Sequence, residues 1–156
     1  MLIHYIVVFL ISMVPLIELR AAIPYGLALG LDPFLTYALA IVGNCLPVPF
    51  ILLFIRKILA WMQGCSVRFF QRVAGYVIEK GEKNFHKVQK YAVFGLFLFV
   101  AIPLPGTGAW TGSLIAALLS MKKRYAFPSI ALGVLAAGVI MSLITGGVLA
   151  GLSWLL

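Results

Sequence analysis

Two ionisable residues, Glu18 and Arg20, lie inside the short stretch "PLIELRAAIP" at residues 15–24, between two strongly apolar runs. A glutamate can carry a proton, and an arginine can hold an anionic group. Placing such a residue within a membrane costs roughly 2.5 to 3.5 kcal/mol, so it normally faces a cavity or a partner. We therefore interpret Arg20 as a binder of an anionic group and Glu18 as a proton site. The alternative is an internal ion pair that only locks the structure together.

A second stretch, "AIPLPGTGAWTGSLIA" at residues 101–116, is rich in proline, glycine and threonine and carries no charge. Glycine has no Cβ, so a ligand or another backbone can come close to it. The free N–H groups at the start of a following helix would favour an anion. Together the two stretches supply the candidate substrate- and proton-binding residues, which are Glu18, Arg20, Pro24, Pro103, Pro105, Gly106, Thr107, Gly108, Trp110 and Thr111.

Other kinds of chemistry have no support in the sequence. His4 and His86 lie far from each other and from Cys45 and Cys65, so no metal-ligand spacing is present. The chain has no Ser/His/Asp set, glycine-rich phosphate loop or pair of carboxylates. The sequence therefore predicts no catalytic residues, no metal and no cofactor, and a function other than that of an enzyme.

The elements that position these residues are helices in a membrane. Hydrophobic residues make up 63% of the chain and charged residues 10%, and the mean hydropathy is +1.13. A soluble chain of this size would expose too much apolar surface. The net charge of +8 comes from basic residues between apolar runs, which act as topology signals and do not indicate nucleic acid. We expect an all-α integral membrane protein with a single membrane domain.

The apolar runs fall into two lengths. Residues 33–55 and 127–156 are long enough to cross a bilayer, which takes about 20 apolar residues. Two pairs of shorter runs, 2–17 with 19–31 and 91–104 with 107–121, are broken by proline, glycine or charge. Broken backbone at membrane depth must be buried in protein or line a wet cavity. Each pair therefore predicts a re-entrant helical hairpin, or alternatively two short tilted crossings.

The basic residues predict the orientation. Residues 56–90 hold eight of the twelve Lys and Arg residues, and residues 122–124 hold three more. By the positive-inside rule these segments lie on the cytoplasmic side of the inner membrane, so Asp32 and both termini lie on the opposite side. Residues 66–90 also show apolar residues at helical spacing. This segment is either an amphipathic helix on anionic headgroups or a plain connector.

The predicted segments follow one another as a hairpin, a span, a connector, a second hairpin and a second span. This order is that of an inverted repeat. Repeat 1 covers about 1–55, the connector 56–90 and repeat 2 91–156. An offset of 90 residues places Pro15 on Pro105 and Gly43 on Gly133. Inverted repeats with broken helices are typical of secondary transporters.

Two functions of different classes follow from these features. The first is a transporter or flippase that moves a small amphipathic or anionic substrate, such as a lipid phosphate, with protons carried by Glu18. The second is a membrane scaffold in which Glu18 and Arg20 are structural. Membrane lipids are the expected partners, and Gly147 and Gly151 near the end of the last span could support a homodimer.

The stretches "ELRAAIPYG" and "AIPLPGTGAWTGSLIA" resemble the two signature regions of the small multidrug export protein family. That family is distantly similar to the DedA/VTT superfamily, which implies two opposed re-entrant hairpins and transport of lipids or lipid carriers. The family name itself implies export of drugs, including cationic ones. DedA-type proteins carry arginines near the second proline motif, whereas residues 99–112 have no charge here. In this comparison only Glu18 has a counterpart, and Arg20 would supply the missing positive charge.

Overall fold

The structure is a computed structural model that describes residues 2–64, 91–104, 106–119 and 121–155. Every regular element in these ranges is an α-helix, which confirms the predicted all-α class for this part of the chain. The helices are α1 (Leu2–Met13), α2 (Glu18–Ala28), α3 (Pro33–Cys45), α4 (Pro47–Gly64), Tyr91–Ala101, α6 (Ala109–Leu118) and α7 (Lys123–Leu155). The predicted amphipathic connector at residues 66–90 and the candidate residue Pro105 lie outside the described residues.

Two long helical segments run through the bundle. Pro33–Ile55, formed by α3 and the start of α4, and Lys123–Val148 of α7 are the two segments among the described residues that are long and apolar enough to cross a membrane. Leu46 joins α3 to α4 with helical backbone angles and donates its N–H to the Val42 carbonyl, so the two helices form one nearly continuous rod. The two predicted long apolar segments are therefore present: the first has the predicted bounds 33–55, and the second lies at 123–148 in place of 127–156.

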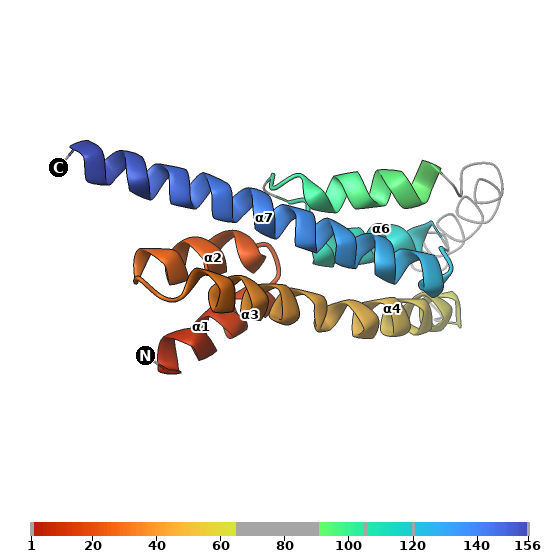
Figure 1. The fold of residues 1–156 in the computed structure, drawn as a ribbon. Helices are drawn as coiled ribbons and strands as arrows, with labels where there is room; N and C mark the ends of the chain where they lie inside the picture. Colours follow the sequence, from red (N-terminus) through yellow and green to blue (C-terminus); the bar gives the residue numbers. More distant parts are fainter. Residues whose placement is uncertain (1, 65–90, 105, 120, 156) are drawn as a thin grey trace.

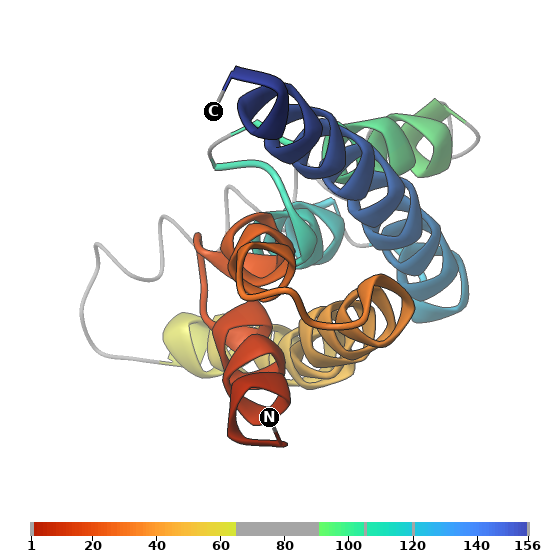
Figure 2. The same ribbon diagram turned by 60° about the vertical axis from the view of Figure 1, so that its left-hand side comes forward.

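Short helices accompany each long segment. α1 and α2 form a hairpin beside α3, and helix Tyr91–Ala101 and α6 form a second hairpin that enters from the other end of the bundle (Figure 1). Both termini and the turn between α2 and α3 lie at one end, whereas the turn between α6 and α7 lies at the opposite end (Figure 1). The returning helices α2 and α6 are central, as Figure 2 shows: α2 packs on α3 and α7, and α6 packs on α4 and α7.

The sequence explains the sharp turn between α2 and α3. Gly30 adopts a positive φ of 69°, which glycine allows without a Cβ clash, and the Leu31 N–H then donates to the Gly26 carbonyl at 3.1 Å. Asp32 caps α3 by accepting the Leu35 N–H at 2.7 Å, and Pro33 follows at the first helical position. Gly30 therefore allows the chain to turn after α2, and Asp32 and Pro33 start α3.

Equivalent backbone features recur 90 residues further along. Leu31 donates to the Gly26 carbonyl, and Met121 donates to the Ala116 carbonyl at 2.9 Å in the turn after α6. The positive φ of Leu16, 70°, has a counterpart in Gly106 at 86°. The close-packed glycines follow the same offset. Gly43 lies against the Phe9 carbonyl of α1, and Gly133 lies against the Phe97 carbonyl of helix Tyr91–Ala101.

The apolar core resembles that of a water-soluble protein, but the outer surface does not. Large apolar side chains such as Phe34, Phe54 and Leu143 are exposed on the outer faces of the helices. The buried polar side chains are Ser12, Glu18, Thr36, Asn44, Ser113 and Ser129. An apolar exterior around a partly polar interior suits a chain surrounded by lipid.

The break in the first hairpin differs from the prediction. It covers residues 14–17, and α2 begins at Glu18, so both ionisable residues belong to the first turn of a helix and not to the break. Pro15 cannot donate a helical hydrogen bond and disfavours helical angles at Val14, which ends α1 early. The second long helix also begins before the predicted residue 127, because α7 includes the basic residues from Lys123 onward.

Labelling of single cysteines tests the orientation. In a background without Cys45 and Cys65, we expect Asp32→Cys to react with a membrane-impermeant maleimide from outside the cell. Lys123→Cys should react only after the membrane is permeabilised, because these turns lie at opposite ends of the bundle and the basic one should be cytoplasmic. Reaction of both positions from the same side would contradict the orientation.

Candidate functional site

The first turn of α2 and the start of α6, each of which follows a hairpin turn, meet in the middle of the bundle. The Trp110 N–H donates to Glu18 Oε1 at 3.2 Å, and the Arg20 guanidinium donates through Nη2 to Thr107 Oγ1 at 2.7 Å. The Trp110 indole N–H also donates to the Met13 carbonyl at 3.1 Å. We call these three hydrogen bonds the tip contact. The two hairpins are therefore in direct contact beside their turns.

Glu18 is the buried centre of the tip contact. Its side chain is 2% exposed, and its backbone has a positive φ of 51°, as the backbone of Leu16 also has. Residues other than glycine seldom adopt this left-handed conformation, and such residues often occur at functional sites. The Glu18 N–H donates to the Val14 carbonyl at 3.0 Å, which closes the turn and directs the carboxylate toward α6.

The carboxylate lies at the amino end of α6. It accepts the Trp110 N–H and lies beside the backbone of Ala109, the first residue of that helix. The unpaired N–H groups and the helix dipole favour negative charge at this position. Gly108 makes the approach possible, since a Cβ there would overlap the carboxylate. The anion predicted for this helix end is thus present, but it comes from the chain itself.

Arg20 reaches the second hairpin separately from Glu18. Its Nη2 donates to Thr107, whose hydroxyl lies 2.7 Å from the Ile102 carbonyl and can donate to it. The internal ion pair between Glu18 and Arg20, which was the alternative interpretation of the sequence, is not formed, because neighbours two apart on the first turn of α2 point in different directions. Arg20 still acts on Glu18 through space, and its Nη1 is buried without a hydrogen-bond partner.

The other predicted residues have different surroundings. Pro24 lies within α2, where its ring leaves the Arg20 carbonyl without the usual helical donor. Pro103 is half-buried in the second turn, and Gly106 is exposed there with a φ of 86°. Thr111 is half-buried in the first turn of α6 and makes no side-chain hydrogen bond within the described part of the chain. These residues shape the turns but do not join the tip contact.

Asn44 is a site residue that the sequence reasoning missed. Its side chain is 1% exposed and lies close enough to the Glu18 carboxylate to interact with it, although neither of its amide atoms makes a hydrogen bond within 3.5 Å. A buried amide without partners is costly, so such a group normally has a reason to be retained. The available signal was a polar amide in the middle of the apolar run 33–55, where polar residues usually mark a functional position.

This arrangement can perform two chemical tasks. The Glu18 carboxylate can gain or lose a proton, and the unpartnered Arg20 Nη1 can bind an anionic oxygen. Among the described residues no group of three or more His, Cys, Asp or Glu side chains could hold a metal ion.

Comparison with known proteins identifies the family of the chain. Residues 18–140 match the family described as "Putative small multi-drug export protein". The match begins at Glu18, directly after the first turn, and includes the second turn, all of Pro33–Ile55 and the first part of α7. No curated protein and no solved structure matches the chain. The more distant similarity to DedA-type proteins stays a prediction.

Proposed function

Because the chain belongs to the small multi-drug export protein family, we propose that it is a membrane transporter built as an inverted repeat of hairpin and span. The hairpins would enter the bilayer from opposite sides and meet near its middle. The opposite directions of the two halves in Figure 1 and the backbone features repeated at an offset of 90 residues support this arrangement. Transporters of this kind work by moving one repeat against the other around a central site.

The observation that carries the proposal is the Glu18 carboxylate at the amino end of α6. In its charged form this group is held by the helix dipole and by the Trp110 N–H. Protonation removes the charge, so the electrostatic attraction between Glu18 of the first hairpin and the amino end of α6 is lost. The proton would then control whether the two hairpins stay together.

Arg20 indicates the charge of the substrate. Since α6 already compensates Glu18, the carboxylate is not free to bind a cation in this arrangement. The buried Arg20 Nη1 has no hydrogen-bond partner, and it would bind an anion once the tip contact opens and exposes it. We therefore propose an amphipathic anionic substrate, with lipid phosphates included. A substrate bound to Arg20 would screen its charge from Glu18, and Glu18 would then take up a proton more readily.

Two other functions make different demands on Glu18 and the tip contact. Export of cationic drugs, as the family name suggests, requires that Glu18 leave α6 and face the substrate. A scaffold requires that the tip contact stay permanently closed. Only the proposed mechanism predicts both selectivity for anions and dependence on protons.

The test is transport in proteoliposomes with two probes. We expect wild-type protein to move a fluorescent short-chain phosphatidate when a pH gradient is applied, and to move tetraphenylphosphonium poorly. Arg20→Gln should reduce phosphatidate transport at least tenfold, because a charge-assisted hydrogen bond contributes about 1.5 to 3 kcal/mol.

The matched control is Lys57→Gln, which removes one exposed positive charge within α4 and should have little effect. Equal loss in both variants would mean that net charge matters and not the site. Preference for the cation would favour drug export, and no transport of either probe would favour the scaffold.

A further inference from the structure

A groove separate from the tip contact lies between helix Tyr91–Ala101 and the start of α7. Its volume is about 420 Å³, which falls within the usual range for small-molecule sites. Apolar side chains form most of its walls, among them Phe94, Phe97 and Leu132. Arg124 and Tyr125 in the first turn of α7 form its polar end.

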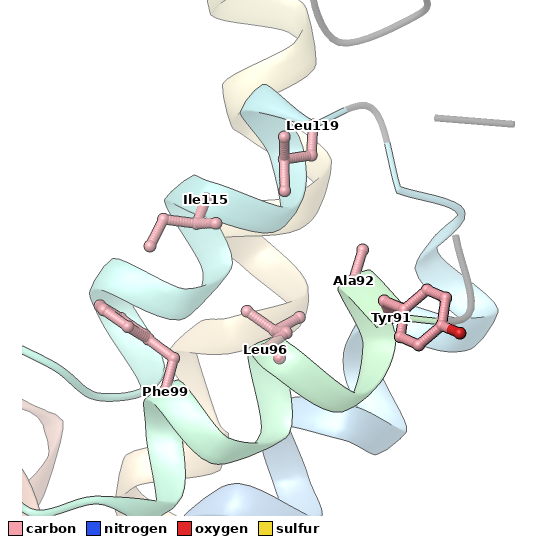
Figure 3. A pocket seen from close by; sticks show the side chains of 7 residues that line it. Tyr91, Ala92, Leu96, Phe99, Ile115 and Leu119 are labelled. Atoms are coloured by element: carbon pink, nitrogen blue, oxygen red, sulfur yellow. The ribbon is translucent and has the colours of Figure 1, made fainter. Parts of the chain in front are cut away.

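The other face of the same helix provides a comparison. There, a groove of about 300 Å³ lies between helix Tyr91–Ala101 and α6, and Figure 3 shows the side chains of Leu96, Phe99 and Ile115 around it. No charged residue lines this second groove. The groove beside α7 therefore differs from this second groove, because it has a charged side chain at one end.

The polar end carries strong positive charge. Lys122, Lys123 and Arg124 are consecutive and exposed, and the amino end of α7 adds to their field. The Arg124 guanidinium lies 4.7 Å from the centre of the Tyr125 ring, so a cation–π interaction holds it at the groove. The two acids among the described residues are remote, since Glu18 is buried in the tip contact and Asp32 lies in the turn at the other end.

We propose that this groove binds an anionic phospholipid, with the phosphate on Arg124 and its neighbouring lysines and an acyl chain between Phe97 and Leu132. Charge complementarity selects the headgroup, and the apolar walls select a ligand with a hydrocarbon chain. A free phosphate would leave the walls empty, and a neutral lipid would leave three adjacent cations without counter-charge. The basic end of a membrane-crossing helix is also the depth at which headgroups lie. None of these residues takes part in the tip contact, so the proposal does not depend on the transport function.

Native mass spectrometry of the detergent-purified protein tests this proposal. We expect wild-type protein to retain phosphatidylglycerol at least tenfold more strongly than phosphatidylcholine with the same acyl chains. Arg124→Gln should remove most of this preference, since it deletes a charge-assisted contact. Lys57→Gln is the control, because Lys57 also carries an exposed cation near an aromatic ring, Phe54, but lies outside the groove.

A second variant examines the apolar part. Leu132→Trp would fill the groove and should weaken retention of phosphatidylglycerol while leaving Arg124 in place. Equal retention of the two lipids by the wild type, or equal effects of Arg124→Gln and Lys57→Gln, would overturn the proposal. Full displacement of phosphatidylglycerol by millimolar inorganic phosphate would also overturn it, because the groove walls would then contribute nothing.

Discussion

Transport by the Glu18→Gln variant should no longer depend on pH and should fall at least tenfold under a proton gradient. Glutamine has nearly the same shape, and its amide oxygen can still accept the Trp110 N–H, so the variant should fold. It cannot change its charge, however, so the interaction of this side chain with the amino end of α6 is the same at every pH. The measurement is the initial rate of phosphatidate transport in proteoliposomes between pH 5 and pH 8, with binding measured on the same samples.

Asp32→Asn is the matched control for that variant. Asp32 is the other acid among the described residues, and it caps α3 in the turn far from the tip contact. Asparagine caps a helix as well as aspartate does, so this variant should keep both its stability and its pH dependence. If Glu18→Gln keeps full activity and the wild-type pH profile, Glu18 does not carry a proton, and the structural account of the tip contact is the better one.

Gly108→Ala should produce the largest loss of stability among single-methyl additions. The added Cβ would overlap the Glu18 carboxylate, and the φ of 150° at this position is one that side chains rarely adopt. Overpacking and a displaced buried carboxylate together cost about 3 kcal/mol. For a chain of this length we expect the thermal unfolding midpoint in detergent to fall by about 10 °C.

Gly147→Ala is the corresponding control. Gly147 lies within α7, and a Cβ there would meet nothing within 4 Å, so alanine should leave the midpoint unchanged or raise it slightly. If the two variants unfold at the same temperature, the carboxylate does not occupy the space that Gly108 leaves open. The tip contact would then be arranged differently from the structure.

The sequence predicted the long helices of this molecule because bilayer thickness sets the length of a span. The apolar run 33–55 and the basic residues at 122–124 gave the long helices and the ends of the bundle directly. Broken helices were also expected to be buried against protein, yet residues 14–17 of the first break are exposed, and the contact with the second hairpin is made by residues that follow them. The exact partners did not follow, because Glu18 binds a backbone N–H, and every residue except proline offers one.

The boundary of α2 shows why the local prediction failed. A continuous apolar pattern contains no signal for a left-handed residue at Leu16 or Glu18, since such conformations are typical of glycine. The helix starts at Glu18 only because contacts with the second hairpin stabilise that turn. Asn44 was missed for a related reason. Its position in a span was clear from the sequence, but its neighbour Glu18 comes from a different helix.

The two left-handed residues also bear on how easily the protein could change state. Leu16 and Glu18 have positive φ, and each such residue costs about 1 to 2 kcal/mol relative to an ordinary conformation. This energy is released when the turn relaxes, so it offsets part of the free energy that holds the hairpins together. In the proposed mechanism, the free-energy difference between a closed and an open tip contact would then be small enough for one protonation to reverse, because one pH unit at one titrating group corresponds to about 1.4 kcal/mol. The strain in the first turn would favour opening, whereas the glycines of the second turn store little strain.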